Sequence, residues 1–267
     1  TKLPGDGALW FAQNLEFLLP VREGDTLTVR AEVVRKDDRT RVVELQTDIF
    51  NQSRQMVTKG VAKVKVVEQE QSLMDDQGQK KAMNKVALVV GGSGGIGSAT
   101  CLALAAAGFD IAVHYLNNLE RASALAKQIK IEGRRAHVFC CDISDQIAVA
   151  NMVDNVVQRL GSVSVLVNCS TTKIAAIKFP ELIWSDFESH LNNQIKGAFN
   201  LARAVVPYME KNRYGKIINI DSQSVDKPET DLLSYITAKS ALRGFTRSLA
   251  LDLAVKGIRV NTVSPGM

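Results

Sequence analysis

The pattern of apolar and polar residues changes near residue 72. Before it, three segments alternate apolar and polar positions, which is the period of antiparallel strands with one face toward water. From residue 84 onward, short apolar runs alternate with longer segments of helical period. Such alternation is typical of parallel strands joined by right-handed crossover helices. The sequence therefore predicts a small antiparallel β segment followed by an α/β domain with a doubly wound parallel sheet.

The predicted elements divide the chain into three parts: a β segment at 1–72, a polar linker at 73–83 and the α/β domain at 84–267. The opening stretch up to Asp25 is predicted to be a loop. The alternating strands of the first part are 25–36, 40–50 and 55–67. After the apolar run 86–90, the second part is expected to contain strands at 109–115, 135–141, 163–168, 215–221 and 258–263, and helices at 96–107, 118–132, 145–160, 185–211 and 234–256.

A glycine-rich turn follows the first apolar run of the α/β part. The sequence Gly91-Gly-Ser-Gly-Gly-Ile-Gly97 is followed by an alanine-rich helical stretch that ends at Gly108. Glycines permit a tight turn and a close approach of backbone to a pyrophosphate, and the helix N-terminus offers free N–H groups to the phosphates. The alternative interpretation is a purely structural turn, but the strand before it and the helix after it favour a dinucleotide site.

A second candidate site lies about 130 residues later. Tyr235 and Lys239 are four residues apart on a predicted helix, and Ser222 ends a predicted strand thirteen residues upstream. Positions i and i+4 share one helix face, so the ammonium can sit beside the phenol. A nearby cation favours phenolate and lowers a phenol pKa from its usual value of about 10. The alternative is an ordinary solvated helix face, because this spacing is common.

Together the two motifs resemble the short-chain dehydrogenase/reductase family, with its Rossmann-type fold, over residues 84 to 267. The nearest resemblance is to 3-oxoacyl thioester reductases, through the glycine turn, Tyr-x-x-x-Lys-Ser-Ala-Leu and the closing Asn-Thr-Val-Ser-Pro-Gly. The resemblance implies catalytic roles for Ser222, Tyr235, Lys239 and Gln194. It implies cofactor binding by Gly91, Ser93, Gly95, Ile96, Gly97, Asp142, Ile143, Asn168, Tyr235, Lys239, Pro265 and Gly266.

Three positions depart from the family pattern. Val90 stands where relatives have a threonine, and Asn168-Cys-Ser-Thr171 stands where they have Asn-Asn-Ala-Gly. In relatives that threonine helps to tie the two loops together, so we interpret both changes as one event. Gln194 takes the place of an asparagine that acts through a local helix distortion, and whether glutamine supports the same distortion is left open.

The resemblance implies reduction of a 3-oxoacyl thioester, on coenzyme A or acyl carrier protein, by a nicotinamide cofactor. After the second strand of the α/β part the sequence reads His114-Tyr-Leu-Asn-Asn118, with no carboxylate before Glu120. An acidic residue there would bind the ribose of NAD(H). We therefore expect NADP(H) to be favoured over NAD(H), and the full-length protein is expected to be a homo-oligomer.

The first part has a resemblance of its own, resting on the opening loop and the strand pattern. Residues 1–67 look like the second half of a hot-dog-fold, MaoC-like enoyl-CoA hydratase, which implies a fragment of a bifunctional hydratase–reductase. The family's catalytic aspartate and histidine lie before this loop, and residues 1–67 contain no histidine. A three-stranded interaction module is the alternative. At the other end, Met267 directly follows Pro265-Gly266, so we expect a C-terminally truncated reductase domain without the family's substrate lid and seventh strand.

Composition narrows the function classes. The net charge is +5 with interspersed charges, so nucleic-acid binding is not expected. Four cysteines without framework spacing indicate reduced thiols in the cytoplasm, the three scattered histidines predict no metal site, and no apolar run is long enough for a membrane span. Two rival functions remain open: a non-catalytic nucleotide-binding scaffold, and a lyase whose active half precedes Thr1.

Overall fold

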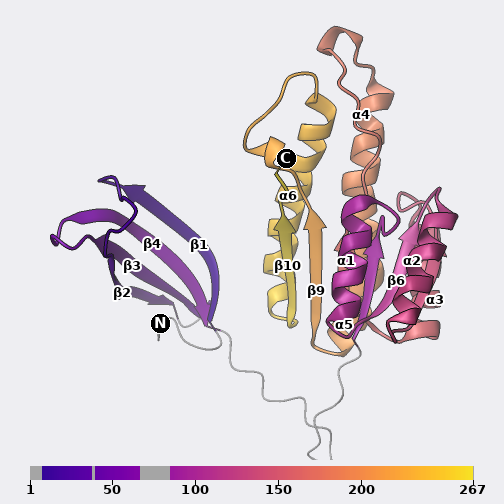
Figure 1. The fold of residues 1–267 in the computed structure, drawn as a ribbon, viewed down its shortest axis with the longest axis horizontal. Coiled ribbons are helices and arrows are strands. Elements are labelled where there is room, and N and C mark those ends of the chain that lie inside the picture. Colours follow the sequence, from indigo (N-terminus) through magenta and orange to yellow (C-terminus); the bar gives the residue numbers. More distant parts are fainter. Residues whose placement is uncertain (1–7, 38–39, 67–84, 267) are drawn as a thin grey trace, which may run out of the picture. The chain divides into compact units, whose positions relative to one another are not determined.

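The structure is a computed structural model that describes residues 8–37, 40–66 and 85–266. The chain divides into two compact units, Thr1–Ala82 and Met83–Met267. The two units are described separately (Figure 1).

The first unit is a four-stranded antiparallel sheet in the order β1-β4-β3-β2. Its strands are β1 (Ala8–Phe17), β2 (Thr28–Asp37), β3 (Val42–Phe50) and β4 (Met56–Val66). A small apolar cluster on one face contains Leu45, Ala62 and Val64. Residues directly opposite each other on neighbouring strands form two ion pairs, Lys59–Glu16 at 3.0 Å and Lys63–Glu44 at 2.7 Å. Opposed charges of this kind stabilise a sheet register.

The prediction of a loop for the opening stretch is wrong in its central part. Ala8–Phe17 is a ten-residue strand that pairs antiparallel with β4. Prolines at positions 4 and 20 and glycines at 5, 7 and 24 surround this segment and resemble loop punctuation. Its partner strand lies more than forty residues further along the chain, so the pairing that makes it a strand is not visible in the local sequence.

The second unit is a six-stranded parallel sheet in the order β10-β9-β8-β5-β6-β7. Every residue of β5 and β8 is buried, as expected for central parallel strands. The strand order reverses between β5 and β8, which is the place where open α/β sheets bind ligands. The strands are β5 (Val86–Val90), β6 (Asp110–Tyr115), β7 (Ala136–Cys140), β8 (Val163–Asn168), β9 (Gly215–Ile220) and β10 (Ile258–Val263).

Helices cover both faces of this sheet (Figure 1). On one face, α1 (Gly95–Ala106) and α2 (Leu119–Ile131) contribute Cys101, Ala105 and Ile129 to the core. On the other face, α3 (Gln146–Leu160), α5 (Gly197–Lys211) and α6 (Leu233–Ala254) pack their apolar stripes on the sheet. The α/β Rossmann-like fold predicted from the sequence is therefore confirmed. No described helix is long and apolar enough to cross a membrane.

The long helix predicted at 185–211 is interrupted. The structure has α4 (Trp184–Leu191), then a π-helical turn η2 (Asn192–Lys196), then α5. One inserted residue per turn barely changes the apolar pattern, so periodicity does not show such a bulge. The other predicted helices and strands of this unit begin and end within two residues of the observed ones. Two short 3₁₀ turns, η1 (Phe179–Glu181) and η3 (Gln223–Val225), complete it.

Candidate active site

The glycine turn between β5 and α1 has the geometry that a dinucleotide requires. Gly91 has a φ of +70°, and a Cβ at Gly97 would collide with the carbonyl of Gly91. Gly95 faces open space, because a Cβ there would meet nothing within 4 Å. The N-cap residue Gly94 provides no side-chain cap, and the first turn of α1 contains no acidic residue. The free N–H groups of α1 are thus open to an anion, which fits the pyrophosphate of a dinucleotide.

His114, at the end of β6, is hydrogen-bonded to this glycine turn. Its Nδ1 accepts a hydrogen bond from the Gly91 N–H at 3.2 Å, and its Nε2 lies 3.0 Å from the Cys141 carbonyl. Because Nδ1 accepts, Nε2 carries the proton and donates to that carbonyl. Burial lowers the pKa of His114, so the ring is neutral at neutral pH. The sequence showed only a scattered histidine here, since the two loops it joins are far apart along the chain.

Val90 at the end of β5 and Cys169 directly after β8 are joined through their backbones. The Cys169 N–H donates to the Val90 carbonyl at 3.0 Å. Asn168 accepts from both the N–H and the hydroxyl of Ser170, at 3.2 and 2.6 Å. The Asn168 Nδ2 is a buried donor with no partner among the described residues. It is therefore available to an acceptor on a bound ligand.

Tyr235 and Lys239 are both buried on α6, with 9 and 3% of their surfaces exposed. The Lys239 Nζ donates to the carbonyl of Ile220 at 2.6 Å and lies 5.9 Å from the centre of the Tyr235 ring. Burial lowers the pKa of Lys239 to about 8, against the raising effect of Asp221 and Cys169. The side chain is thus an ammonium at neutral pH.

Ser222 follows β9 immediately, and its hydroxyl is engaged within its own loop. Its Oγ accepts from the Ser224 N–H at 3.2 Å and donates to the Ser224 hydroxyl at 3.1 Å. The Ser224 hydroxyl in turn donates to Glu229 at 3.0 Å. To donate to a substrate oxygen, the Ser222 hydroxyl would have to leave Ser224.

Gln194 lies in the middle of the π-helical turn η2 and is fully buried. Its Nε2 donates to the Ser170 carbonyl at 3.3 Å and to the Asn193 Oδ1 at 3.1 Å. Its Oε1 has no partner among the described residues. The helix distortion is therefore present with glutamine at position 194.

The other predicted cofactor residues occupy two loops. Asp142 is exposed after β7 and accepts from the Ser144 N–H at 2.8 Å. The Ile143 side chain is buried in the core, so only its backbone could meet a ligand. The carbonyl of Pro265 accepts from the Gln223 N–H at 3.2 Å, which places Pro265-Gly266 beside the Ser222 loop. Ser93 is half-buried and Ile96 exposed in the glycine turn.

A buried histidine that the sequence did not indicate packs against Tyr235. The His190 ring, on α4, meets the Tyr235 ring edge to face with centroids 5.9 Å apart. Its Nδ1 lies 2.8 Å from the Thr172 hydroxyl. Burial and the charge of Lys239 lower the pKa of His190. The contact limits the positions that the phenol ring can take.

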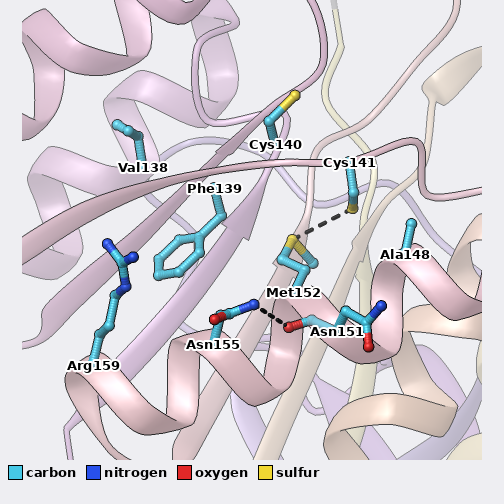
Figure 2. A pocket seen from close by; sticks show the side chains of 9 residues that line it. All are labelled: Val138, Phe139, Cys140, Cys141, Ala148, Asn151, Met152, Asn155 and Arg159. Atoms are coloured by element: carbon cyan, nitrogen blue, oxygen red, sulfur yellow. Dashed lines mark hydrogen bonds between the residues drawn. The ribbon is translucent and has the colours of Figure 1, made fainter.

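A separate hollow of about 430 Å³ lies between β7 and α3 (Figure 2). The Asn155 amide within it donates to the Asn151 carbonyl, and the Cys141 thiol contacts Met152. None of the predicted site residues is part of this lining, so this hollow is distinct from the candidate active site. The lining residues are Val138, Phe139, Cys140, Cys141, Ala148, Asn151, Met152, Asn155 and Arg159.

The fold and the residues at the carboxyl ends of its strands are those of a nucleotide-binding oxidoreductase. The family model described as short chain dehydrogenase matches residues 85–267. The chain belongs to this family, and it is an oxidoreductase.

Several relatives share about a third of their residues with this chain. A 3-oxoacyl-[acyl-carrier-protein] reductase from Staphylococcus epidermidis is 35% identical over 69% of this chain and 75% of its own length. A 2,3-dihydro-2,3-dihydroxybenzoate dehydrogenase from Bacillus subtilis is 34% identical over 68% of this chain and 69% of its own length. Among solved structures, acetoin dehydrogenase from Enterobacter cloacae matches with a TM-score of 0.65 and 33% identity, covering 70% of this chain and 74% of that one.

The burial of His114 predicts a pH dependence of stability. The pKa of His114 is lower in the folded state than its ordinary value of 6.5. The unfolded chain therefore binds more protons once the pH falls below about 6.5, and stability that is fully present above this pH is lost below it. We expect His114→Gln to lower the free energy of unfolding near neutrality by about 1–2 kcal/mol, through its lost hydrogen bonds. The variant should also show a smaller further loss on acidification than the wild type.

Denaturant unfolding at a neutral and a mildly acidic pH measures both effects. His137→Gln is the comparison for the neutral-pH effect: burial and the charges of Lys130, Arg159 and Arg135 also lower the pKa of His137, but its side chain makes no hydrogen bond within the described residues, so this replacement should leave the free energy of unfolding near neutrality almost unchanged. Equal acid sensitivity of wild type and His114→Gln would contradict the role assigned to the ring.

Proposed function

We propose that this chain catalyses the NADP(H)-dependent reduction of a 3-oxoacyl thioester to the 3-hydroxyacyl thioester. The observation that carries the proposal is the burial of Tyr235 and Lys239 side by side on α6, with Lys239 bound to the carbonyl two residues before Ser222. The relatives named as 3-oxoacyl-[acyl-carrier-protein] reductases support the choice of substrate. The acyl carrier, coenzyme A or acyl carrier protein, is left to experiment.

Each of the proposed catalytic residues has a separate role in the reduction. A reduced nicotinamide, when bound, supplies the hydride for the keto carbon. Tyr235 donates a proton to the keto oxygen, and Ser222 donates a hydrogen bond that supports the charge developing there. The Lys239 ammonium stabilises the phenolate that remains on Tyr235. Gln194 lies in the π-helical turn η2. We propose that the proton is returned to Tyr235 from the side of this turn.

The glycine turn would hold the pyrophosphate, and the loops after β7 and β10 would complete the cofactor site. We propose that Asp142, the Ile143 backbone and Asn168 meet the nucleotide, with Pro265 and Gly266 near the nicotinamide. At the end of β6, Asn118 accepts from the Arg121 N–H at 2.9 Å and caps α2. The absence of a carboxylate from residues 114–118 supports NADP(H) over NAD(H).

Cofactor oxidation with an acetoacetyl thioester tests the reaction. We expect NADPH to be oxidised in a thioester-dependent way, with kcat/KM at least about tenfold above that for NADH, because no acid competes with the 2′-phosphate. Acetoin reduction and xylitol oxidation serve as comparison substrates, since both activities are named in similar solved structures. Faster turnover of either substrate would replace the thioester in the proposal, and tight NADPH binding without any turnover would favour the scaffold alternative.

Replacing the proposed acid separates chemistry from binding. Tyr235→Phe should lower kcat by at least about a thousandfold, because no other group donates the proton, while the dissociation constant of NADPH changes less than about threefold. Single-turnover kinetics and cofactor fluorescence measure the two quantities. Tyr208→Phe, on α5, is the matched control: its hydroxyl is bound to Asp154 at 2.7 Å, away from the site. Wild-type turnover by Tyr235→Phe would refute the acid role.

For the first unit we propose a partial hot-dog, MaoC-like segment of a bifunctional hydratase–reductase. Its long antiparallel strands of nine to eleven residues support this proposal. A hydratase and a ketoacyl reductase would share the 3-hydroxyacyl thioester as product and substrate. Homo-oligomerisation and a cytoplasmic location stay predictions.

The same segment predicts that the chain does not hydrate enoyl thioesters. Residues 1–67 contain no histidine to act as the general acid or base that the resemblance requires. We expect no conversion of crotonyl-CoA above the uncatalysed rate, followed by loss of absorbance of its conjugated bond. A rate that saturates with crotonyl-CoA would show that another group in this chain carries that chemistry.

A further inference from the structure

Behind the proposed catalytic groups, Arg243 connects α6 to the end of β9. It follows Lys239 by four residues and Tyr235 by eight, so the three side chains lie along one helix face. The Arg243 Nε donates to the Asp221 Oδ2 at 2.6 Å. Its two terminal nitrogens donate to the two Asp226 oxygens at 2.6 and 3.0 Å, in the fork geometry that arginine forms with a carboxylate.

Asp221 is a carboxylate whose side chain has no exposed surface. Its Oδ2 also accepts from the Ser264 hydroxyl at 3.2 Å, and its N–H donates to the Val263 carbonyl at 2.8 Å. Its Oδ1 has no partner among the described residues. The Arg243 guanidinium pairs with this buried carboxylate, which offsets the cost of removing the group from water.

Arg243 binds residues on both sides of Ser222. Asp221 directly precedes the serine, and Asp226 directly follows η3. The third contact of Arg243 is with the Ser222 carbonyl, at 3.4 Å. One turn earlier on α6, Lys239 donates to the Ile220 carbonyl. Two successive turns of α6 thus bind three consecutive residues at the end of β9.

We propose that Arg243 and Asp221 are positioning residues for the ketone reduction: paired with each other, they fix the loop that carries Ser222. The inference rests on the proposed function, which it extends to two residues outside the Ser222, Tyr235 and Lys239 set.

Asp221→Asn tests the ion pair, because it keeps an oxygen for Arg243 and removes only the charge. We expect kcat to fall, because a weaker hold on the loop displaces Ser222, while the KM for the thioester changes less than about threefold. Asp252→Asn, an exposed acid on the same helix, is the control and should change neither. Wild-type kcat in folded Asp221→Asn would overturn the role assigned to Asp221.

Arg243→Met tests the hold on Ser222. We expect kcat to fall about ten- to a hundredfold, because a displaced Ser222 loses its hydrogen bond in the transition state, while the KM for the thioester changes less than about threefold. Arg243→Lys keeps the charge without the fork and should recover only part of the rate. Arg247→Met, one turn further along α6 and exposed, should behave as wild type. Wild-type kcat in Arg243→Met would overturn the proposal.

Should Arg243→Met fail to fold, Arg243→Lys and Asp226→Asn provide the same comparison of kcat with KM. A wild-type protein that reduces no thioester would remove the proposed function. That result is distinct from an active wild type with an equally active Arg243→Met, which would overturn the positioning role alone.

Discussion

The candidate site depends on the burial of one cation. Lys239 is almost wholly inside the protein, and moving its pKa from 10.5 to about 8 corresponds to roughly 3 kcal/mol that favours the neutral amine. The carbonyl of Ile220 accepts a hydrogen bond from this ammonium, and the charge of Asp221 raises the pKa of Lys239 against the effect of burial. The end of β9 and the face of α6 are therefore held in one arrangement, and Tyr235 and Ser222 are placed by it.

Two links hold the loops around the glycine turn. The Cys169 N–H donates to the Val90 carbonyl, which joins the ends of β5 and β8 through the backbone. The neutral ring of His114 joins the turn after β5 to the loop after β7. Asn168 and Gln194 both bind Ser170, and each keeps one buried polar atom without a partner among the described residues.

The two units of the chain differ in how their structure is stabilised. The second unit buries two large apolar clusters, one on each face of its sheet. Among the side chains that the structure describes, the first unit has a buried cluster of three residues together with cross-strand ion pairs. Its strand β2 is exposed along nearly its whole length, with Val29 61% exposed.

Much of this could be predicted from the sequence. Five unbroken apolar residues, a glycine turn and alternating helical periods determined the parallel sheet, because buried strands and crossover helices leave a strong local signal. The i, i+4 spacing placed Tyr235 and Lys239 on one face. The strand β1, the π-helical turn at Gln194, the bridging ring of His114 and the Asp221–Arg243 pair were not visible. Each of them joins residues distant in sequence or changes the helix by a single residue, so only the tertiary structure could decide them.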